Sequence, residues 1–228
     1  DKLFEETKKE SSKNYLTLPS EFVTLTGKNK GLASIRVLNY LQNRGITQQD
    51  IVNWKIGYCL QGPFKDRVIV PSFDDDGHVN YFVARTFSGD WRKYLNPSAS
   101  KDIIFNHLFI DWDKDLVIVE GIFDAIKAGT NSIPLLGSTL RANSVLFQEI
   151  IKRDTSVFVA LDEDAEKKGV GIISKLLSYG AEVFKIDTSG FEDVGSMTQE
   201  EFQERKSNAK FMNPDTFLMN HALDSIKI

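Results

Sequence analysis

The sequence predicts an α/β fold in which a parallel sheet flanked by helices follows a smaller, basic subdomain of mixed α and β structure. Two observations support this prediction. Strand-like and helix-like segments alternate after residue 115, and short segments rich in β-branched and aromatic residues precede them. The 228 residues are expected to comprise a flexible arm or linker at 1–30, the basic subdomain at 31–108, the parallel-sheet domain at 109–205 and a helical tail at 206–228.

The basic subdomain is expected to begin with helices and to continue as a hairpin. Apolar residues recur at helical spacing in 34–45, and Thr47 is a suitable N-cap for a second, shorter helix. From about residue 66 to 96, the segments RVIVPSF, HVNYFVART and KYLNP are typical of strands, and DDDG is a turn signal between the first two. These features predict an antiparallel hairpin.

The second domain is expected to alternate strands and helices. The predicted strands are 116–120, 132–137, 156–162 and 181–187. The predicted helices are 124–129, 144–153 and 169–180. Such alternation implies right-handed crossovers and a parallel sheet covered by helices.

The composition excludes several classes of protein. With one cysteine, Cys59, and three histidines, the chain has neither an internal disulfide nor a zinc finger or ribbon. No apolar run reaches the roughly 18 residues of a membrane helix, and no basic-then-apolar leader opens the chain. We therefore expect a cytoplasmic protein with no membrane partner. Because the chain begins with Asp1 rather than Met, we expect a fragment or a processed product.

Charge is distributed unevenly along the chain. The formal net charge is −4, but the segment 36–101 holds nine Lys or Arg and six Asp, a net of +3, which leaves −7 for the rest. A basic part and an acidic part suit a protein that holds polyanions on one side and metal ions on the other.

Acidic residues follow the strands of the predicted sheet. Glu120 ends the first strand, with Asp124 one turn into the next helix. Asp162 ends the third strand, and Asp164 follows it. Acids also end or follow the fourth strand, at Asp187, Glu192 and Asp193. Because parallel strands present their carboxyl ends at one edge, these acids are expected to gather there, where a cation such as Mg²⁺ or Mn²⁺ would neutralise them.

These acids resemble a known family. Glu120-Gly121-x-x-Asp124 followed by Asp162-x-Asp164 is similar to the Toprim domain shared by DnaG-type primases, topoisomerases, OLD-type nucleases and RecR. LGSTL, at 136–140, is similar to the loop that DnaG-type primases place after the second Toprim strand. Asp193 falls near the third acidic motif of that family, which is usually Asp-x-Asp.

The region before the acids resembles the core motif of DnaG-type primases. The matches are RVIVP at 67–71, then Arg85 preceded by Val-Ala in place of two glycines, then KYLN at 93–96. The segment 40–59 is similar to the helical entry of that core, so the resemblance covers about residues 31–205.

The resemblance implies a DNA-dependent RNA polymerase that makes short RNA primers on single-stranded DNA by two-metal nucleotidyl transfer. By this resemblance, the catalytic and metal-binding residues are Glu120, Asp162 and Asp164. Asp124 and Asp193 would support the metal site or contact it directly. The residues expected to bind the nucleotide or template are Arg67, Arg85, Lys93, Tyr94 and Asn96.

Departures from the bacterial pattern bear on the expected partners. Phe105-Asn106-His107 occupies the region where bacterial primases often carry a lysine after Phe-His. The zinc-binding and helicase-binding domains of bacterial primases are missing from this chain, which makes it most like compact phage primases. The expected partners are single-stranded DNA, nucleoside triphosphates, a replicative helicase and a zinc-binding domain on another chain, with no zinc bound in this one.

Other readings of the sequence stay open. A Toprim nuclease would use the same acids to cut a phosphodiester, and a non-catalytic Toprim module would only bind partners. Trp91 beside Arg92 is compatible either with stacking on a base or with packing at an interface. Lys101 is expected to be solvated and Cys59 to be a small core residue.

Overall fold

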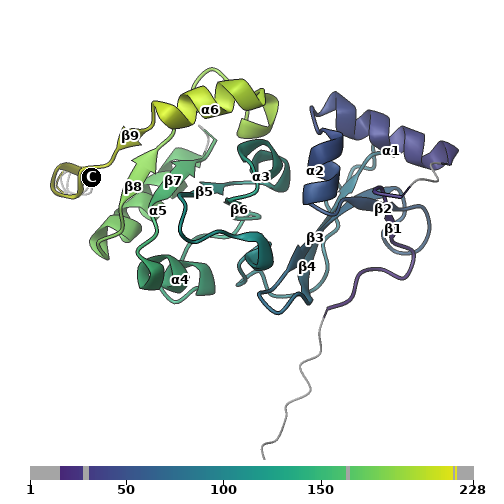
Figure 1. Ribbon diagram of the computed structural model, residues 1–228, viewed down its shortest axis with the longest axis horizontal. Coiled ribbons are helices and arrows are strands. Elements are labelled where there is room, and N and C mark those ends of the chain that lie inside the picture. Colours follow the sequence, from purple (N-terminus) through teal and green to yellow (C-terminus); the bar gives the residue numbers. More distant parts are fainter. Residues whose placement is uncertain (1–15, 28–30, 163–164, 218, 220–228) are drawn as a thin grey trace, which may run out of the picture.

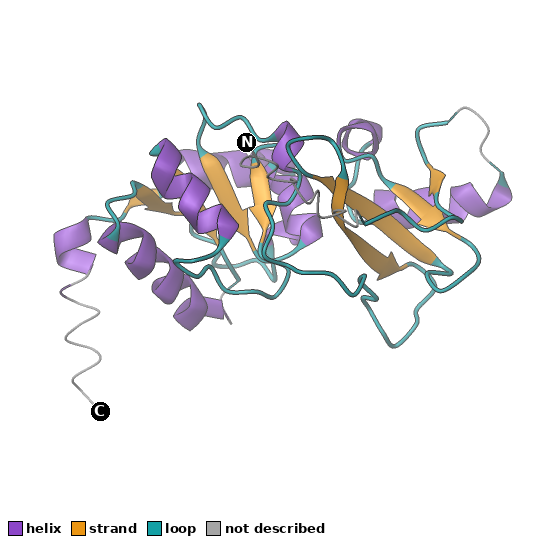
Figure 2. Ribbon diagram, turned by 90° about the horizontal axis from the view of Figure 1, so that it is seen from below, coloured by secondary structure: helices purple, strands orange, loops and turns teal. Residues whose placement is uncertain are grey.

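The computed structural model describes residues 16–27, 31–162, 165–217 and 219. Its strands form a four-stranded and a five-stranded sheet, which lie side by side along the longest axis of the molecule (Figure 1). When the view is turned by 90° about the horizontal axis, the two sheets are still seen as two separate groups of strands (Figure 2). The predicted α/β class, with a mixed subdomain ahead of a parallel sheet, is confirmed.

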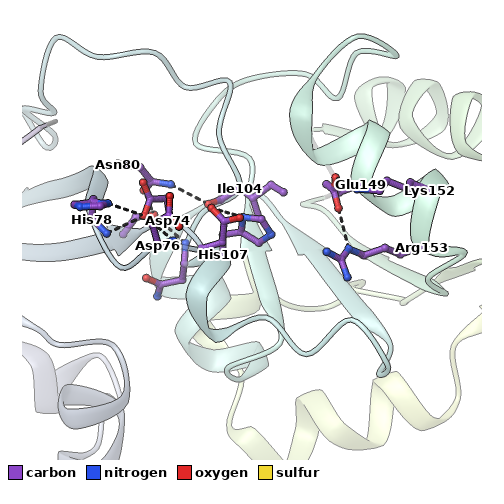
Figure 3. A network of polar contacts seen from close by, with 12 residues as sticks. Asp74, Asp76, His78, Asn80, Ile104, His107, Glu149, Lys152 and Arg153 are labelled. Atoms are coloured by element: carbon purple, nitrogen blue, oxygen red, sulfur yellow. Dashed lines mark hydrogen bonds and ion pairs between the residues drawn. The ribbon is translucent and has the colours of Figure 1, made fainter. Parts of the chain in front are cut away.

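The first sheet is antiparallel and has the order β1-β2-β3-β4. Its strands are β1 (Val23–Thr24), β2 (Gly57–Cys59), β3 (Arg67–Phe73) and β4 (Val79–Thr86). The β3–β4 hairpin is the predicted one, and its turn is ordered by Asp74, whose Oδ1 accepts the backbone N–H groups of Asp76 at 3.1 Å and His78 at 2.8 Å (Figure 3). The DDDG acids therefore shape a turn.

Two helices pack beside the first sheet. They are α1 (Leu32–Asn43) and α2 (Gln48–Asn53). Thr47 caps α2 as predicted: its Oγ1 accepts the Asp50 N–H at 3.1 Å, and Asp50 Oδ2 accepts the Thr47 N–H at 2.8 Å. On α1 the buried face carries Val37 and Leu41.

The predicted arm, 1–30, lies partly outside the described residues, and its described part differs from the prediction. Val23 and Thr24 pair with β2 as an edge strand, and Leu25 is buried. The Phe22 ring lies against Gly57, where an added Cβ would come within 2.3 Å of it. This contact fixes the segment 22–25 to the sheet, so the subdomain begins before residue 31.

The second sheet has the order β6-β5-β7-β8-β9, and its first four strands are parallel. The strands are β5 (Leu116–Val119), β6 (Ser132–Pro134), β7 (Val157–Ala160), β8 (Val183–Lys185) and β9 (Lys210–Phe211). The helices are α3 (Ile122–Ala128), α4 (Val145–Arg153), α5 (Glu166–Ser178) and α6 (Gln199–Ser207). Helices α3 and α6 lie on one side of this sheet, with α4 and α5 on the other (Figure 1). The described residues also include the short 3₁₀ turns η1 (His107–Phe109) and η3 (Val194–Ser196).

The end of the second domain also differs from the prediction. The domain was expected to stop at 205, but α6 continues to Ser207 and β9 pairs antiparallel with β8. Met212, just after β9, is buried. Of the predicted helical tail, 206–228, residues 206–217 and 219 are described, and 214–217 and 219 are helical; residues 218 and 220–228 lie outside the described part of the chain.

Buried side chains connect the two halves. One continuous apolar cluster includes Leu41 of α1, Val70 of β3 and Ile118 of β5. At the junction, Lys127 Nζ of α3 donates to Gly45 O at 3.4 Å. Asn80 Nδ2 of β4 donates to Ile104 O at 3.2 Å, which ties the hairpin to the segment leading into the second domain (Figure 3). The two sheets are therefore held together by a shared core.

Two further sequence predictions concern burial and hydropathy. Cys59 is a core residue, fully buried, and desolvation followed by the Glu21 charge raises the pKa of its thiol to about 11. Such a thiol is an unreactive packing group. In the described part of the chain, no helix is both long enough and apolar enough to cross a membrane.

Candidate active site

A cleft of about 450 Å³ lies where the two halves meet. The second domain contributes acids to its wall: Glu120, Asp124, Asp162 and Asp193. The segment that follows β4 contributes Tyr94, Asn96 and Lys101. The structure therefore brings four of the predicted acids and two of the predicted nucleotide-binding residues to one place.

The sheet explains why the acids converge. Each of β5 and β7 is a short buried strand, and the two are parallel neighbours in register from Leu116 with Val157 to Val119 with Ala160. Glu120 and Asp162 follow these strands, so both leave the sheet at the same edge. Asp187 follows β8 but lines a different pocket and pairs with Arg205 at 3.1 Å. Asp164 lies outside the described residues.

Asp124 holds two loops at the cleft. Its Oδ2 accepts the Gly121 N–H at 2.8 Å, and its Oδ1 accepts the Gly195 N–H at 2.8 Å. Gly121 follows Glu120, and Gly195 lies two residues after Asp193. A Cβ added at either glycine would lie 2.9 or 3.0 Å from the Asp124 carboxylate, which explains the need for glycine at both positions.

The pKa of Asp124 reports the electrostatics of the cleft. Desolvation, followed by the charge of Asp193, raises the pKa of this buried carboxyl, and Glu120 adds a smaller effect in the same direction. The two backbone N–H bonds oppose the rise. Negative charge is thus concentrated at this edge of the sheet, where a bound cation would be stabilised.

A lysine that the sequence analysis did not single out faces Glu120. Lys168 of α5 places its Nζ 2.5 Å from Glu120 Oε1, and both side chains are partly buried. Lys168 lies in the first turns of the helix that follows Asp162. The available signal was a lysine in the first turn of a helix that follows a strand end, because helical side chains tilt toward the helix N-terminus.

Lys101 is exposed, as the sequence predicted, and it also has a partner at the cleft. Its Nζ donates to Leu136 O at 2.8 Å, and the side chain lines the cleft beside the acids. Leu136 and Gly137 both have positive φ, 53° and 77°, so the LGSTL loop turns sharply at this point. Lys101 thereby attaches the loop after β6 to the segment that precedes η1.

The predicted nucleotide-binding residues have different environments. Lys93 is exposed, and Tyr94 is partly exposed with the Arg85 guanidinium 4.7 Å from its ring centroid. Burial raises the pKa of Tyr94, and the Arg85 charge opposes this. Asn96 Oδ1 accepts the Ala84 N–H at 3.1 Å, which positions its amide at the cleft wall.

Arg67 departs from the prediction. It is only 2% exposed, and its guanidinium is occupied by protein groups. Nη1 donates to the carbonyls of Arg92 at 3.0 Å and Lys93 at 3.4 Å, and Nη2 bonds Asp90 Oδ2 at 2.9 Å. A buried charge is tolerated only when it is paired and hydrogen-bonded in this way. Arg67 therefore supports the loop before Tyr94 from beneath.

The donor set of the cleft suits a hard divalent cation. Glu120 and Asp162 supply carboxylate oxygens, which Mg²⁺ and Mn²⁺ prefer. Among the residues that the structure describes, no three His, Cys, Asp or Glu side chains are grouped closely enough to form a ready-made metal site. The third predicted ligand, Asp164, lies outside that part of the chain.

The raised pKa of Asp124 predicts how stability depends on pH. A folded-state pKa above the unfolded value means that the folded state binds this proton more tightly. The stabilisation of the folded state by this tighter proton binding is fully present below the unfolded pKa, about 4, and is lost as the pH rises through the folded pKa. Measured by urea unfolding from pH 4 to 7, the wild type should lose stability relative to Asp124→Asn.

The exposed acid Asp113, replaced by Asn, controls for the removal of one negative charge. The difference in the free energy of unfolding between the wild type and Asp124→Asn should change with pH in favour of the variant. A difference that stays constant, or that changes in favour of the wild type as the pH rises, would contradict the assigned electrostatics.

The sequence of this chain is similar to those of curated DNA primases. No model of a known protein family matches the chain. A DNA primase of Thermotoga maritima is 21% identical over 209 residues, covering 72% of this chain and 37% of that protein. A DNA primase of Synechococcus elongatus is 27% identical over 135 residues, covering 51% of this chain and 20% of that protein. The chain thus spans well under half the length of the curated relatives it matches.

The structural comparison covers more of the chain. A solved structure of the DnaG primase catalytic domain bound to single-stranded DNA superposes with a TM-score of 0.72 and 20% identity. The match covers 86% of this chain and 78% of that one. The predicted resemblance is confirmed at this level, whereas the likeness to compact phage primases stays a prediction. This chain therefore has the fold of the DnaG primase catalytic core.

Proposed function

We propose that this chain is the catalytic core of a DNA primase, a DNA-dependent RNA polymerase that makes short RNA primers on single-stranded DNA. The observation that carries the proposal is the composition of one cleft. Acids from the strand ends of one domain face Tyr94, Asn96 and Lys101, which follow the hairpin of the other. Nucleotidyl transfer needs both kinds of group, since it brings together anionic phosphates and cations.

The acids are proposed to hold the catalytic cations. Glu120, Asp162 and Asp164 would bind Mg²⁺ or Mn²⁺, which would activate the primer 3′-hydroxyl and neutralise charge on the phosphates. Asp124 has both carboxylate oxygens engaged with backbone N–H groups, so we assign it to ordering the Glu120 and Asp193 loops. Asp193 lines the cleft and remains a further candidate ligand.

The basic side of the cleft is proposed to hold the nucleotide and the template. Arg85 suits this role because its guanidinium carbon lies 4.7 Å from the ring centroid of Tyr94, which lines the cleft. Lys93 is exposed and carries a positive charge, and Tyr94 presents an aromatic face. Asn96 lines the same wall. Arg67 would act indirectly, through the loop that its guanidinium holds.

The proposed partners follow from the proposed reaction. They are a single-stranded DNA template and nucleoside triphosphates. A replicative helicase and a zinc-binding domain on another chain would complete the machinery in the cytoplasm, or in the host cytoplasm if a phage encodes the chain. The DnaG catalytic domain of similar fold, which was solved with single-stranded DNA, supports the template assignment.

Primer synthesis is the direct test of this proposal. With a single-stranded template, labelled nucleoside triphosphates and Mg²⁺ or Mn²⁺, the wild type should produce short RNA. Glu120→Gln and Asp162→Asn should reduce the product by about a hundredfold or more, because each removes a cation-binding carboxylate. Denaturing gel electrophoresis of the labelled products measures the effect.

Asp113→Asn, which changes an exposed acid that does not line the cleft, should retain wild-type synthesis. Metal-dependent cleavage of the template without RNA synthesis would favour a Toprim nuclease instead. Neither product, even with a zinc-binding domain and helicase supplied, would favour a non-catalytic binding module.

The ion pair between Lys168 and Glu120 predicts competition for the metal. Glu120 Oε1 lies 2.5 Å from Lys168 Nζ, so the ammonium group and a metal cation would compete for the same oxygen. Lys168→Met should therefore bind Mn²⁺ several-fold more tightly than the wild type, as measured from the electron paramagnetic resonance signal of free Mn²⁺.

Lys167→Met is the matched control, since Lys167 is the exposed neighbour on the same helix and its loss changes the net charge equally. Equal Mn²⁺ affinities for the two variants would show that the ion pair does not compete with the metal.

A further inference from the structure

The loop of residues 90–93, which directly precedes Tyr94 of the cleft wall, exposes a tryptophan. Trp91 is 85% exposed, so its indole is accessible to a partner, as both roles compatible with the sequence, stacking on a base and packing at an interface, require. The loop leads directly into Tyr94, which lines the cleft. Because consecutive Cα atoms are 3.8 Å apart, the Cα of Trp91 lies within about 11 Å of the Cα of Tyr94.

The backbone of this loop is held in place even though its side chains are exposed. Arg67 bonds the carbonyls of Arg92 and Lys93 from below and pairs with Asp90 at 2.9 Å. Asp90 Oδ1 accepts the Arg92 N–H at 2.9 Å. The Lys93 carbonyl also accepts the Thr86 N–H of β4 at 3.1 Å. A buried arginine thus fixes a short loop that presents an indole to solvent.

The charges around the indole favour an anionic partner. The Arg92 guanidinium carbon lies 5.3 Å from the centroid of the Trp91 ring, and Lys93 is exposed beside them. The one acid of the loop, Asp90, is paired with Arg67. An exposed aromatic ring flanked by cations is the combination that binds single-stranded nucleic acid, because bases stack on the ring while phosphates meet the cations.

We propose that Trp91 is a stacking platform for an unpaired base of the template strand, with Arg92 and Lys93 contacting the adjoining phosphates. The inference rests on the proposed primase function and adds a place for the template outside the acidic cleft. Stacking reads only the π-face of a base, so the platform is tolerant of template sequence. Because Arg67 already holds the loop in one conformation, less conformational entropy is lost when the template binds.

The test separates stacking from charge. Fluorescence anisotropy at low salt would compare a fluorescein-labelled oligo(dT) of about 20 nucleotides, a size that spans one to several single-strand sites, with an abasic oligonucleotide of equal length and charge. Trp91→Ala should bind oligo(dT) about tenfold more weakly than the wild type, with little change for the abasic strand. Trp91→Phe should recover part of the loss, because it restores an aromatic face.

Leu32→Ala is the matched control, since Leu32 is an exposed apolar side chain on α1, 86% accessible. This variant should bind both strands as the wild type does. Equal oligo(dT) affinities for the wild type and Trp91→Ala would overturn the platform and leave the primase proposal standing, with Trp91 then available to a protein partner. If Trp91→Ala lost as much affinity for the abasic strand as for oligo(dT), that result would also overturn the platform. No binding of either strand by the wild type would overturn the template assignment and the platform together.

Discussion

The arrangement of the acidic cleft depends on one buried carboxylate. Asp124 accepts a backbone N–H from Gly121 and another from Gly195, and these two glycines lie next to Glu120 and close to Asp193. Segments 71 residues apart in the chain are thereby held at the same sheet edge. Burial, followed by the charge of Asp193 and a smaller effect of Glu120, raises the pKa of Asp124, and Lys168 pairs with Glu120 at the same edge.

The basic side uses the same physical principle with the opposite charge. Arg67 is buried beneath the loop of residues 90–93, and its hydrogen bonds to carbonyls and to Asp90 compensate for its desolvation. In both halves, a buried ion is satisfied by the backbone of a loop, and the loop presents other groups to the solvent. Rigid support of this kind keeps catalytic and binding side chains in position before a ligand arrives.

The sequence predicted the elements that have strong periodicity or turn chemistry. The β3–β4 hairpin, the alternation from β5 to β8 and the Thr47 cap were found where they were expected. Strands β1, β2 and β9 were missed because segments of two or three residues carry no alternation pattern. The acids converged because parallel topology requires it, but the roles of Arg67, Lys101 and Lys168 depend on contacts between distant segments. Spacing along the chain does not encode such contacts, so Arg67 was assigned to the ligand although its partners are protein atoms.

One cleft joins the proposed metal-binding acids to the proposed nucleotide-binding residues. The most direct measurement is anomalous scattering from crystals of the chain grown with Mn²⁺ and a nucleoside triphosphate. We expect an anomalous peak coordinated by Glu120 and Asp162, with the triphosphate between that peak and Arg85. Manganese bound only at other acids, such as Asp74 or Asp187, with no nucleotide in the cleft, would contradict this assignment.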